Sequence, residues 1–265
     1  MEKLKVFSNF GFGFDMDVIE PCELYVDRIP KTPKNTKRLL WVIEPDEVSK
    51  MTKKIINNKD KYDKILAYDT TILESCENST LFPYGTTWIK DFDITKPKEF
   101  CVTSLIGAKK MCSNHHLRHQ LIKRSHEINS IPVHLFNSSN KGIKVPNNLK
   151  SMKNKTYKNE LFYSQYHIAI ENTTQDNWFT EKLIDCFQTK TVPIYIGCRN
   201  IGKFFDINGI IHVENLDELI DACNNIDDNT YESMKESIDK NYELSFKYSD
   251  HIKSLKDKIT ELLGN

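Results

Sequence analysis

Short apolar runs alternate with longer amphipathic stretches along most of this 265-residue chain. Runs that are apolar at nearly every position are typical of strands buried on both faces of a parallel sheet. The first part of the chain has predicted strands at residues 4–7, 38–43, 64–68 and 80–83, and a predicted helix at 48–57. Residues 92–99, which contain Pro97, indicate a linker. The first section is therefore expected to be a small α/β layer.

The second part of the chain has a more regular order of strands and helices. Strands are predicted at residues 100–106, 131–136, 166–170, 192–196 and 209–213. Helices are predicted at residues 115–128, 180–188, 216–225, 231–242 and 246–263, and a loop at 142–159. This alternation indicates βαβ units in a doubly wound parallel sheet. We therefore expect domains at residues 1–98 and 99–245, with a last helix at 246–265 that packs back across them.

Composition narrows the classes of function. The chain carries 37 Lys and Arg against 37 Asp and Glu, whereas a dedicated nucleic-acid binder usually has a basic excess. Hydrophobic residues make up 39%, which is enough for a buried core. No stretch has the ~20 apolar residues of a membrane span, and the first residues lack a signal-peptide core, so we expect a cytoplasmic protein. The seven cysteines form no C-x-x-C pair, which favours reduced structural thiols.

Polar residues follow several predicted strands of the second domain. Ligands of open parallel sheets bind beyond the carboxyl ends of the strands. The polar residues expected at this edge are Arg118, Asn172, Glu181, Lys182 and Arg199. A lysine in the first turn of a helix, such as Lys182, is unfavourable there unless an anion binds nearby, and a diphosphate would suit the position. The alternative is an exposed lysine that pairs with Glu181 or Asp185.

The segment from residue 168 to residue 197 carries the most specific pattern of the chain. It combines a strand that ends before Glu171 and Asn172, an aromatic residue at Trp178, a Thr-Glu-Lys triplet at 180–182 and a Thr-Val-Pro-Ile-Tyr-Ile-Gly strand at 191–197. The pattern combines an uncommon triplet with fixed spacing in a strand–helix–strand context. On these residues the chain resembles the α-1,3/4-fucosyltransferases, which are the family 10 glycosyltransferases.

The resemblance implies a fold and a reaction. The implied fold is GT-B, in which two Rossmann-like α/β domains face each other across a cleft. The acceptor side would be N-terminal and the nucleotide-sugar side C-terminal. The implied reaction is inverting transfer of L-fucose from GDP-fucose to a saccharide hydroxyl of the O3 or O4 type, with no cofactor besides the donor substrate.

The resemblance also implies roles for single residues. Glu44 ends a strand that begins Lys-Arg, as in the family, and would be the base that deprotonates the acceptor hydroxyl. The implied donor-binding residues are Arg118, Asn172, Trp178, Glu181 and Lys182, of which the two cations would hold the diphosphate. Further candidates for the acceptor or donor edge are Phe10, Gly11, Asp69, Gly197 and Arg199. The alternative for Glu44 and Asp69 is that both are solvated loop acids.

Other interpretations compete with parts of this prediction. Two Asp-x-Asp tripeptides, at 15–17 and 91–93, are patterns that bind divalent cations in some transferases. Neither follows the strand with the donor signature, so we expect metal-independent chemistry. His115 and His119 lie four residues apart, which fits a polar helix face better than a metal pair.

Three alternatives concern function. The same fold could use another nucleotide sugar, or it could be a non-enzymatic module that binds a sugar nucleotide or a glycan. A dinucleotide oxidoreductase is disfavoured, because no G-x-G-x-x-G follows a predicted strand.

The lysine-rich stretch 141–158 is either a solvated loop or a flap that attracts phosphates or makes peripheral contact with an anionic membrane.

Overall fold

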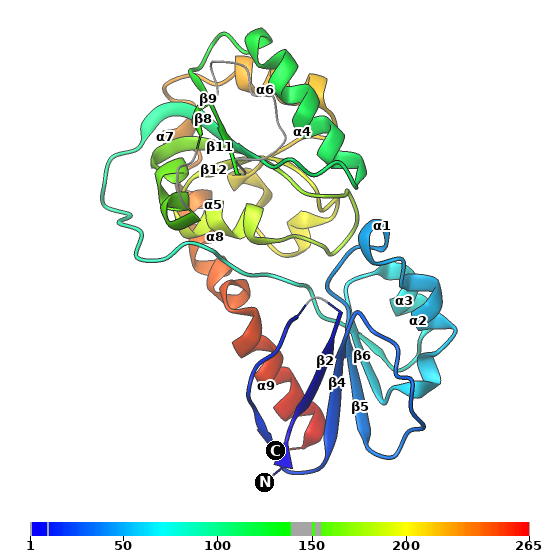
Figure 1. The fold of residues 1–265 in the computed structure, drawn as a ribbon. Coiled ribbons are helices and arrows are strands. Elements are labelled where there is room, and N and C mark those ends of the chain that lie inside the picture. Colours follow the sequence, from blue (N-terminus) through cyan, green and yellow to red (C-terminus); the bar gives the residue numbers. More distant parts are fainter. Residues whose placement is uncertain (1, 10, 139–149, 152–154, 265) are drawn as a thin grey trace. The chain divides into compact units, whose positions relative to one another are not determined.

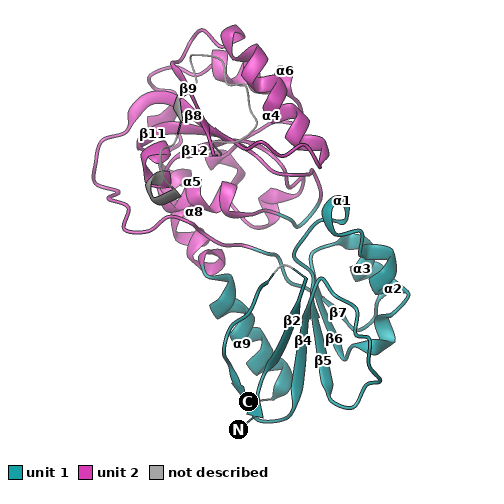
Figure 2. Cartoon of the chain, viewed as in Figure 1, with its two compact units in different colours: residues 1–84, 176–178, 250–265 teal, residues 85–175, 179–249 magenta. Residues whose placement is uncertain are grey.

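The computed structural model describes the chain except for residues 1, 10, 139–149, 152–154 and 265. Contacts divide the described residues into two compact units (Figure 2). Unit 1 comprises residues 1–84, 176–178 and 250–265, and unit 2 comprises residues 85–175 and 179–249. Most of the loop predicted at 142–159, and with it most of the lysine-rich stretch, lies outside the described residues.

Unit 1 is built on a parallel sheet with the strand order β2-β4-β5-β6-β7 (Figure 1). Its strands are β2 (Lys5–Ser8), β4 (Cys22–Val26), β5 (Lys37–Trp41), β6 (Lys64–Ala67) and β7 (Ser79–Leu81). A short antiparallel ladder pairs β1 (Glu2–Lys3) with β3 (Asp17–Val18). The four strands predicted here are confirmed, and β4 is a strand that the apolar pattern did not reveal.

The helices of unit 1 are α1 (Asp46–Ser49), α2 (Thr52–Ile56), α3 (Thr70–Ser75) and α9 (His251–Leu263), with a 3-10 turn η1 (Lys59–Lys61). The single helix predicted at 48–57 is wrong. Lys50 adopts a left-handed conformation with a φ of 53° and ends α1. Asp46 Oδ1 then accepts the N–H of Thr52 at 2.8 Å, where α2 begins. Helix α9 packs Leu255 and Ile259 into the core of this unit.

Unit 2 contains a second parallel sheet, with the strand order β10-β9-β8-β11-β12-β13. Its strands are β8 (Glu99–Ile106), β9 (Val133–Asn137), β10 (Lys150–Ser151), β11 (Ser164–Ile170), β12 (Val192–Ile196) and β13 (Ile211–His212). From β8 the chain proceeds outward to β9 and β10, and from β11 it proceeds the other way. This is the doubly wound sheet that the sequence predicted.

The helices of unit 2 are α4 (Ser113–Arg124), α5 (Glu181–Gln188), α6 (Leu216–Asn224), α7 (Thr230–Ser233) and α8 (Lys235–Ser249). The 3-10 turns are η2 (Ser125–Glu127), η3 (Lys155–Tyr163), η4 (Ile201–Lys203) and η5 (Ile207–Gly209). Leu121 of α4 packs with one face of β11, through Ile168, and Leu183 of α5 packs with the other face, through Ala169. The sheet is therefore buried on both faces, which explains its apolar strands.

The break before the last helix lies later than predicted. Residues 243–245 were expected to separate two helices, but they belong to α8. Asp250 follows α8, and its carboxylate accepts the N–H of Lys253 at 2.9 Å as the N-cap of α9. An acidic N-cap of this kind satisfies a backbone donor that has no partner within the helix, so the second helix begins there.

The segment that leads into β8 packs with unit 2, although a domain boundary was expected at residue 98. The carboxylate of Asp185, on α5, accepts the hydroxyl of Thr87 at 2.7 Å and the N–H of Trp88 at 2.8 Å. Gly85 lies so close to Tyr248 that an added Cβ would be 2.6 Å from the Tyr248 Cβ. These contacts hold residues 85–88 against α5 and α8.

Among the residues that the structure describes, none of the helices is both long enough and apolar enough to cross a bilayer.

The contact between Gly85 and Tyr248 generates a stability prediction. Gly85→Ala is expected to lower the free energy of unfolding by about 1–3 kcal/mol, because the backbone of Tyr248 must move to admit the methyl group. Gly13→Ala is the matched control, since a Cβ there meets no atom within 4 Å. Urea unfolding of the two variants measures the difference. Equal stabilities would contradict the packing of residue 85 on α8.

Candidate active site

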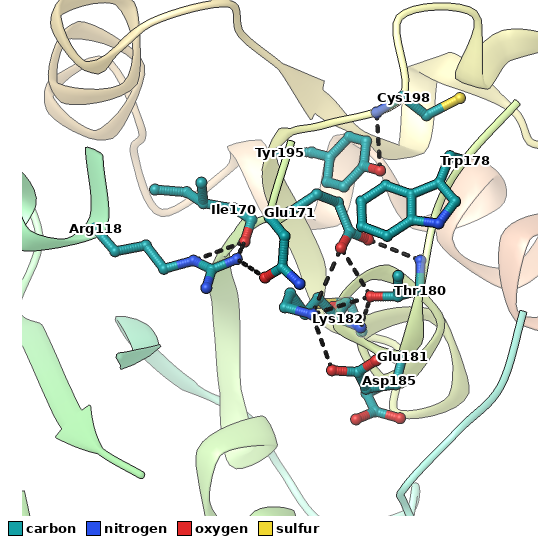
Figure 3. Close-up of polar contacts among 12 residues, drawn as sticks. Arg118, Ile170, Glu171, Trp178, Thr180, Glu181, Lys182, Asp185, Tyr195 and Cys198 are labelled. Carbon is teal, nitrogen blue, oxygen red and sulfur yellow. Dashed lines mark hydrogen bonds and ion pairs between the residues drawn. The ribbon is translucent and has the colours of Figure 1, made fainter. Parts of the chain in front are cut away.

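The carboxyl ends of β8 and β11 are adjacent, and the chain departs from them in opposite directions. Such a switch point is where doubly wound sheets bind ligands. Four of the residues predicted to bind the donor gather here: Arg118, Asn172, Glu181 and Lys182. Figure 3 labels Arg118, Glu181 and Lys182 among them. They come from α4, from the loop after β11 and from the first turn of α5.

The Arg118 guanidinium is fixed at the end of β11. The residue is 7% exposed, and Nε and Nη2 both donate to the carbonyl oxygen of Ile170, the Nε bond being 2.9 Å long. Nη2 also donates to Asn172 Oδ1 at 3.0 Å. Burial lowers the pKa of Arg118, and the charges of Glu171 and Glu181 oppose that effect. The result is a cation whose position is set by the sheet itself.

Lys182 is the more exposed of the two cations, with 24% of its side chain accessible. Its Nζ donates to Glu181 Oε1 at 3.0 Å and to Thr180 Oγ1 at 3.1 Å, and lies 3.6 Å from Glu171 Oε2. Burial would lower the pKa of Lys182, but Glu181 and Glu171 outweigh it and raise that pKa. The pairing with Glu181 that the sequence suggested is present, whereas Asp185 pairs with Lys158 instead.

Glu171 joins β11 to α5. Its carboxylate is fully buried and accepts the N–H of Thr180 at 2.8 Å and the Thr180 hydroxyl at 2.7 Å. Burial raises the pKa of Glu171, while Lys182 opposes the rise. Gly197, predicted at this edge, lies against it: an added Cβ would be 2.6 Å from Glu171 Cγ and 2.4 Å from the Tyr195 hydroxyl oxygen. A side chain at 197 would therefore displace the acid.

His115 belongs to this cluster, although it was interpreted from the sequence as part of a polar helix face. It is 4% exposed, and its Nδ1 accepts the N–H of Cys112 at 3.0 Å. The proton must then be on Nε2, and the ring hydrogen-bonds the side chain of Asn172. Burial and the charge of Arg118 lower the pKa of His115 to about 4. The sequence could have indicated this, because His115 lies three residues before Arg118 and therefore on the same face of helix α4.

The remaining predicted residues belong to unit 1 or, in the case of Arg199, to the surface of unit 2. Glu44 follows β5 and is half-buried, and its N–H donates to Asp27 Oδ2 at 3.1 Å. Asp69 caps α3, where Oδ1 accepts the N–H of Ile72 at 3.1 Å. Gly11 has a φ of 71°, and Phe10 is outside the described residues. Arg199 is exposed after β12.

Trp178, predicted to line the donor pocket, is part of unit 1. It is 2% exposed, and its ring packs beside Tyr68, with the ring centroids 6.2 Å apart. Its Nε1 donates to the carbonyl oxygen of Ile43 at 3.1 Å. The indole therefore supports the strand end that precedes Glu44, and its contact with a donor stays a prediction.

In the described part of the chain, no three His, Cys, Asp or Glu side chains are grouped so as to hold a metal ion. All seven cysteines lie within the described ranges as buried thiols. Burial raises the pKa of Cys22 and of Cys223 to about 12, so both are neutral at physiological pH.

Comparison with known proteins agrees with the motif. The family model "Glycosyltransferase family 10 (fucosyltransferase) C-term" matches residues 96–256. A stretch of 69 residues is 41% identical to the α-(1,3)-fucosyltransferase FucT of Helicobacter pylori; it covers 24% of this chain and 14% of that protein. The chain thus matches only a small part of the length of this relative.

Solved structures share the fold. A crystal structure of an α1,3-fucosyltransferase with GDP-fucose gives a TM-score of 0.54 at 18% identity, covering 92% of this chain and 78% of that one. S. aureus TarM, crystallised with UDP among its ligands, gives a TM-score of 0.62 at 13% identity, covering 92% and 55%. These likenesses show a GT-B fold built on two α/β units with parallel sheets. Because the family model covers more than half of its residues, the chain belongs to glycosyltransferase family 10, the fucosyltransferases.

Proposed function

We propose that this chain transfers L-fucose from GDP-fucose to an O3- or O4-type hydroxyl of a saccharide, with inversion at the anomeric carbon. The observation that carries the proposal is the cluster of Arg118, Asn172 and Lys182 at the switch point of the unit 2 sheet. Membership of family 10 and the identity to a bacterial α-(1,3)-fucosyltransferase support fucose as the sugar.

In this proposal unit 2 binds the donor. The acceptor oxygen bonds to the anomeric carbon of fucose, the bond from that carbon to the diphosphate breaks, and GDP leaves with the electron pair. Arg118 and Lys182 stabilise the negative charge that develops on the leaving diphosphate, a task for which fixed cations are more effective than mobile ones. The first turns of α4 and α5 lie at the same edge and add partial positive charge.

The proton of the acceptor hydroxyl goes to Glu44 of unit 1. A carboxylate serves as a general base when it is within hydrogen-bond reach of the hydroxyl that attacks. Glu44 follows a central strand of its sheet, in the family's Lys-Arg strand context. The charge balance of this chemistry needs no metal ion, and we propose that the transfer is metal-independent.

We assign His115 a supporting role at the donor edge. The neutral ring donates from Nε2 to Asn172, and Arg118 Nη2 donates to the same amide oxygen. Two donors on Oδ1 fix which way the Asn172 amide faces, and they direct its Nδ2 hydrogens away from Arg118. Those hydrogens are then oriented to donate to an anionic or hydroxylated ligand.

The cellular location of the protein and two alternatives to fucose transfer complete the proposal. We propose a cytoplasmic enzyme, in keeping with the buried thiols. Use of another nucleotide sugar on this fold is the alternative for an enzyme. A sugar-nucleotide or glycan-binding module without transfer is the alternative without catalysis, and the two experiments on Lys182 and Glu44 distinguish them.

Donor binding depends on Lys182. Purified protein is expected to bind GDP-fucose in isothermal titration calorimetry and to give no signal with UDP-sugars. Lys182→Ala should weaken binding roughly tenfold to hundredfold, because a hydrogen bond to a charged group contributes about 1.5–3 kcal/mol. Lys240→Ala is the control, since this lysine pairs with Asp206 elsewhere on unit 2. Binding of UDP-sugars without GDP-fucose would contradict the donor assignment.

Transfer depends on Glu44. Glu44→Gln should reduce transfer at least a hundredfold in assays run in EDTA, while the Kd for GDP-fucose stays within about twofold, since loss of a general base costs about 10²–10⁴ in rate. Glu47→Gln, at an exposed acid three residues along, is the matched control. Normal turnover of Glu44→Gln would remove this base, and wild-type activity that requires added Mn²⁺ would refute metal independence.

The protonation of His115 can be followed directly. Its pKa of about 4 lies below the ordinary 6.5, so the unfolded chain binds the proton first as pH falls. His115 therefore contributes stability that is complete above pH 6.5 and is lost between about 6.5 and 4. In ¹⁵N-histidine NMR, with His115→Gln to assign the signal, we expect an Nε2–H tautomer down to about pH 5. A midpoint near 6.5 or an Nδ1–H tautomer would contradict the contact with Asn172.

A further inference from the structure

A buried acid lies beside the proposed base in unit 1. Asp27 follows β4 and is 0% exposed. Its Oδ1 accepts the N–H of Ile43 and its Oδ2 accepts the N–H of Glu44, both at 3.1 Å. Among the ion pairs of the described residues, none involves Asp27. The carboxylate therefore binds two consecutive backbone N–H groups in place of a cation.

Backbone contacts fix Asp27 itself. Its N–H donates to the carbonyl oxygen of Trp41 at 3.0 Å, and its own carbonyl oxygen accepts Asn9 Nδ2 at 2.6 Å. The residue adopts a φ of 47°, in the left-handed region that disfavours most side chains with a Cβ, although aspartate and asparagine adopt it more readily than others. Asp27 is therefore tied both to the end of β5 and to the segment after β2.

Burial of the Asp27 carboxylate costs free energy in addition to the left-handed backbone. Desolvation raises the pKa of Asp27 to about 7, against the two N–H donors that favour the charged form. An asparagine would tolerate the left-handed backbone without a charge, but its NH₂ group would face one of the two N–H donors. A carboxylate can accept both. Strain and a buried acid at one residue mark a place where the geometry of the neighbouring backbone matters.

We propose that Asp27 is a positioning residue for the acceptor-side base. By accepting the N–H groups of Ile43 and Glu44, it fixes the backbone from which the Glu44 side chain starts. This inference rests on the proposed role of Glu44 in transfer. Asp27 touches no reacting atom and acts through Glu44, and a displacement of about 1 Å in a reacting group can reduce a rate by about 10²-fold.

The test combines two substitutions. Asp27→Asn is expected to lower kcat roughly tenfold to hundredfold, while the Kd for GDP-fucose stays within about twofold. In a Glu44→Gln background, the same substitution should change the residual transfer by less than about twofold, because residues that act as a unit are not additive. Residual transfer is measured with radiolabelled donor over long incubations.

A matched control lies at the other end of the same strand. Asp63 Oδ2 accepts the N–H of Arg38, the second residue of β5, at 2.7 Å. Asp63→Asn removes a carboxylate from a backbone N–H of β5 without touching Glu44, so kcat should stay within about twofold of wild type. A loss of kcat equal to that of Asp27→Asn would assign the effect to general weakening of the strand and overturn the inference.

Failure of this inference and failure of the base assignment give different results. The inference is overturned if Asp27→Asn has normal kcat, or if it lowers residual transfer by the same factor with and without Glu44. Normal turnover of Glu44→Gln contradicts the base assignment itself, so failure of the proposed function is recognised separately. Urea unfolding reports whether each variant is folded. If Asp27→Asn is not, Asp27→Gly, which suits the left-handed backbone, carries the same comparison.

Discussion

The proposed donor edge of unit 2 depends on the burial of one carboxylate, that of Glu171. It holds the start of α5 to the end of β11 through two hydrogen bonds to Thr180, and it lies 3.6 Å from the Lys182 ammonium. A buried acid that loses its partners is strongly destabilising, so these groups must be in place together. The acid also fills the space above residue 197, which is why that position is a glycine.

This arrangement would let a chain with no net charge provide the proposed anion site. Two cations, Arg118 and Lys182, lie close to two acids, Glu171 and Glu181. Burial would raise the pKa of Glu181, but Lys182 and Lys158 outweigh it and lower that pKa to about 2. The acids hold the cations in one place, and their charges offset those of the cations. A diphosphate needs a few cations that are already placed, and a basic surface would add non-specific binding.

Local patterns predicted the sheets because burial on both faces makes strands apolar throughout. The gathering of the predicted donor residues was also predictable, because a parallel sheet brings the residues after its strands to one edge, and Asn172 and Lys182 follow such a strand. His115 was missed because its environment, and with it the lowered pKa, arises from packing between α4 and the end of β11. Asp27 was missed because the polar Glu23 interrupts β4, so neither the strand nor the acid after it was recognised.

Asp27 and Glu171 are buried acids in equivalent positions of the two separate sheets. Each follows the carboxyl end of a parallel strand, is fully buried, and accepts backbone N–H groups of the segment that carries a proposed functional side chain. Burial raises the pKa of both acids, so keeping either carboxylate charged costs free energy. Loops after strands lack the ladder hydrogen bonds that fix the strands themselves. A buried carboxylate replaces those bonds, and it gives a loop residue the positional precision that transfer chemistry requires.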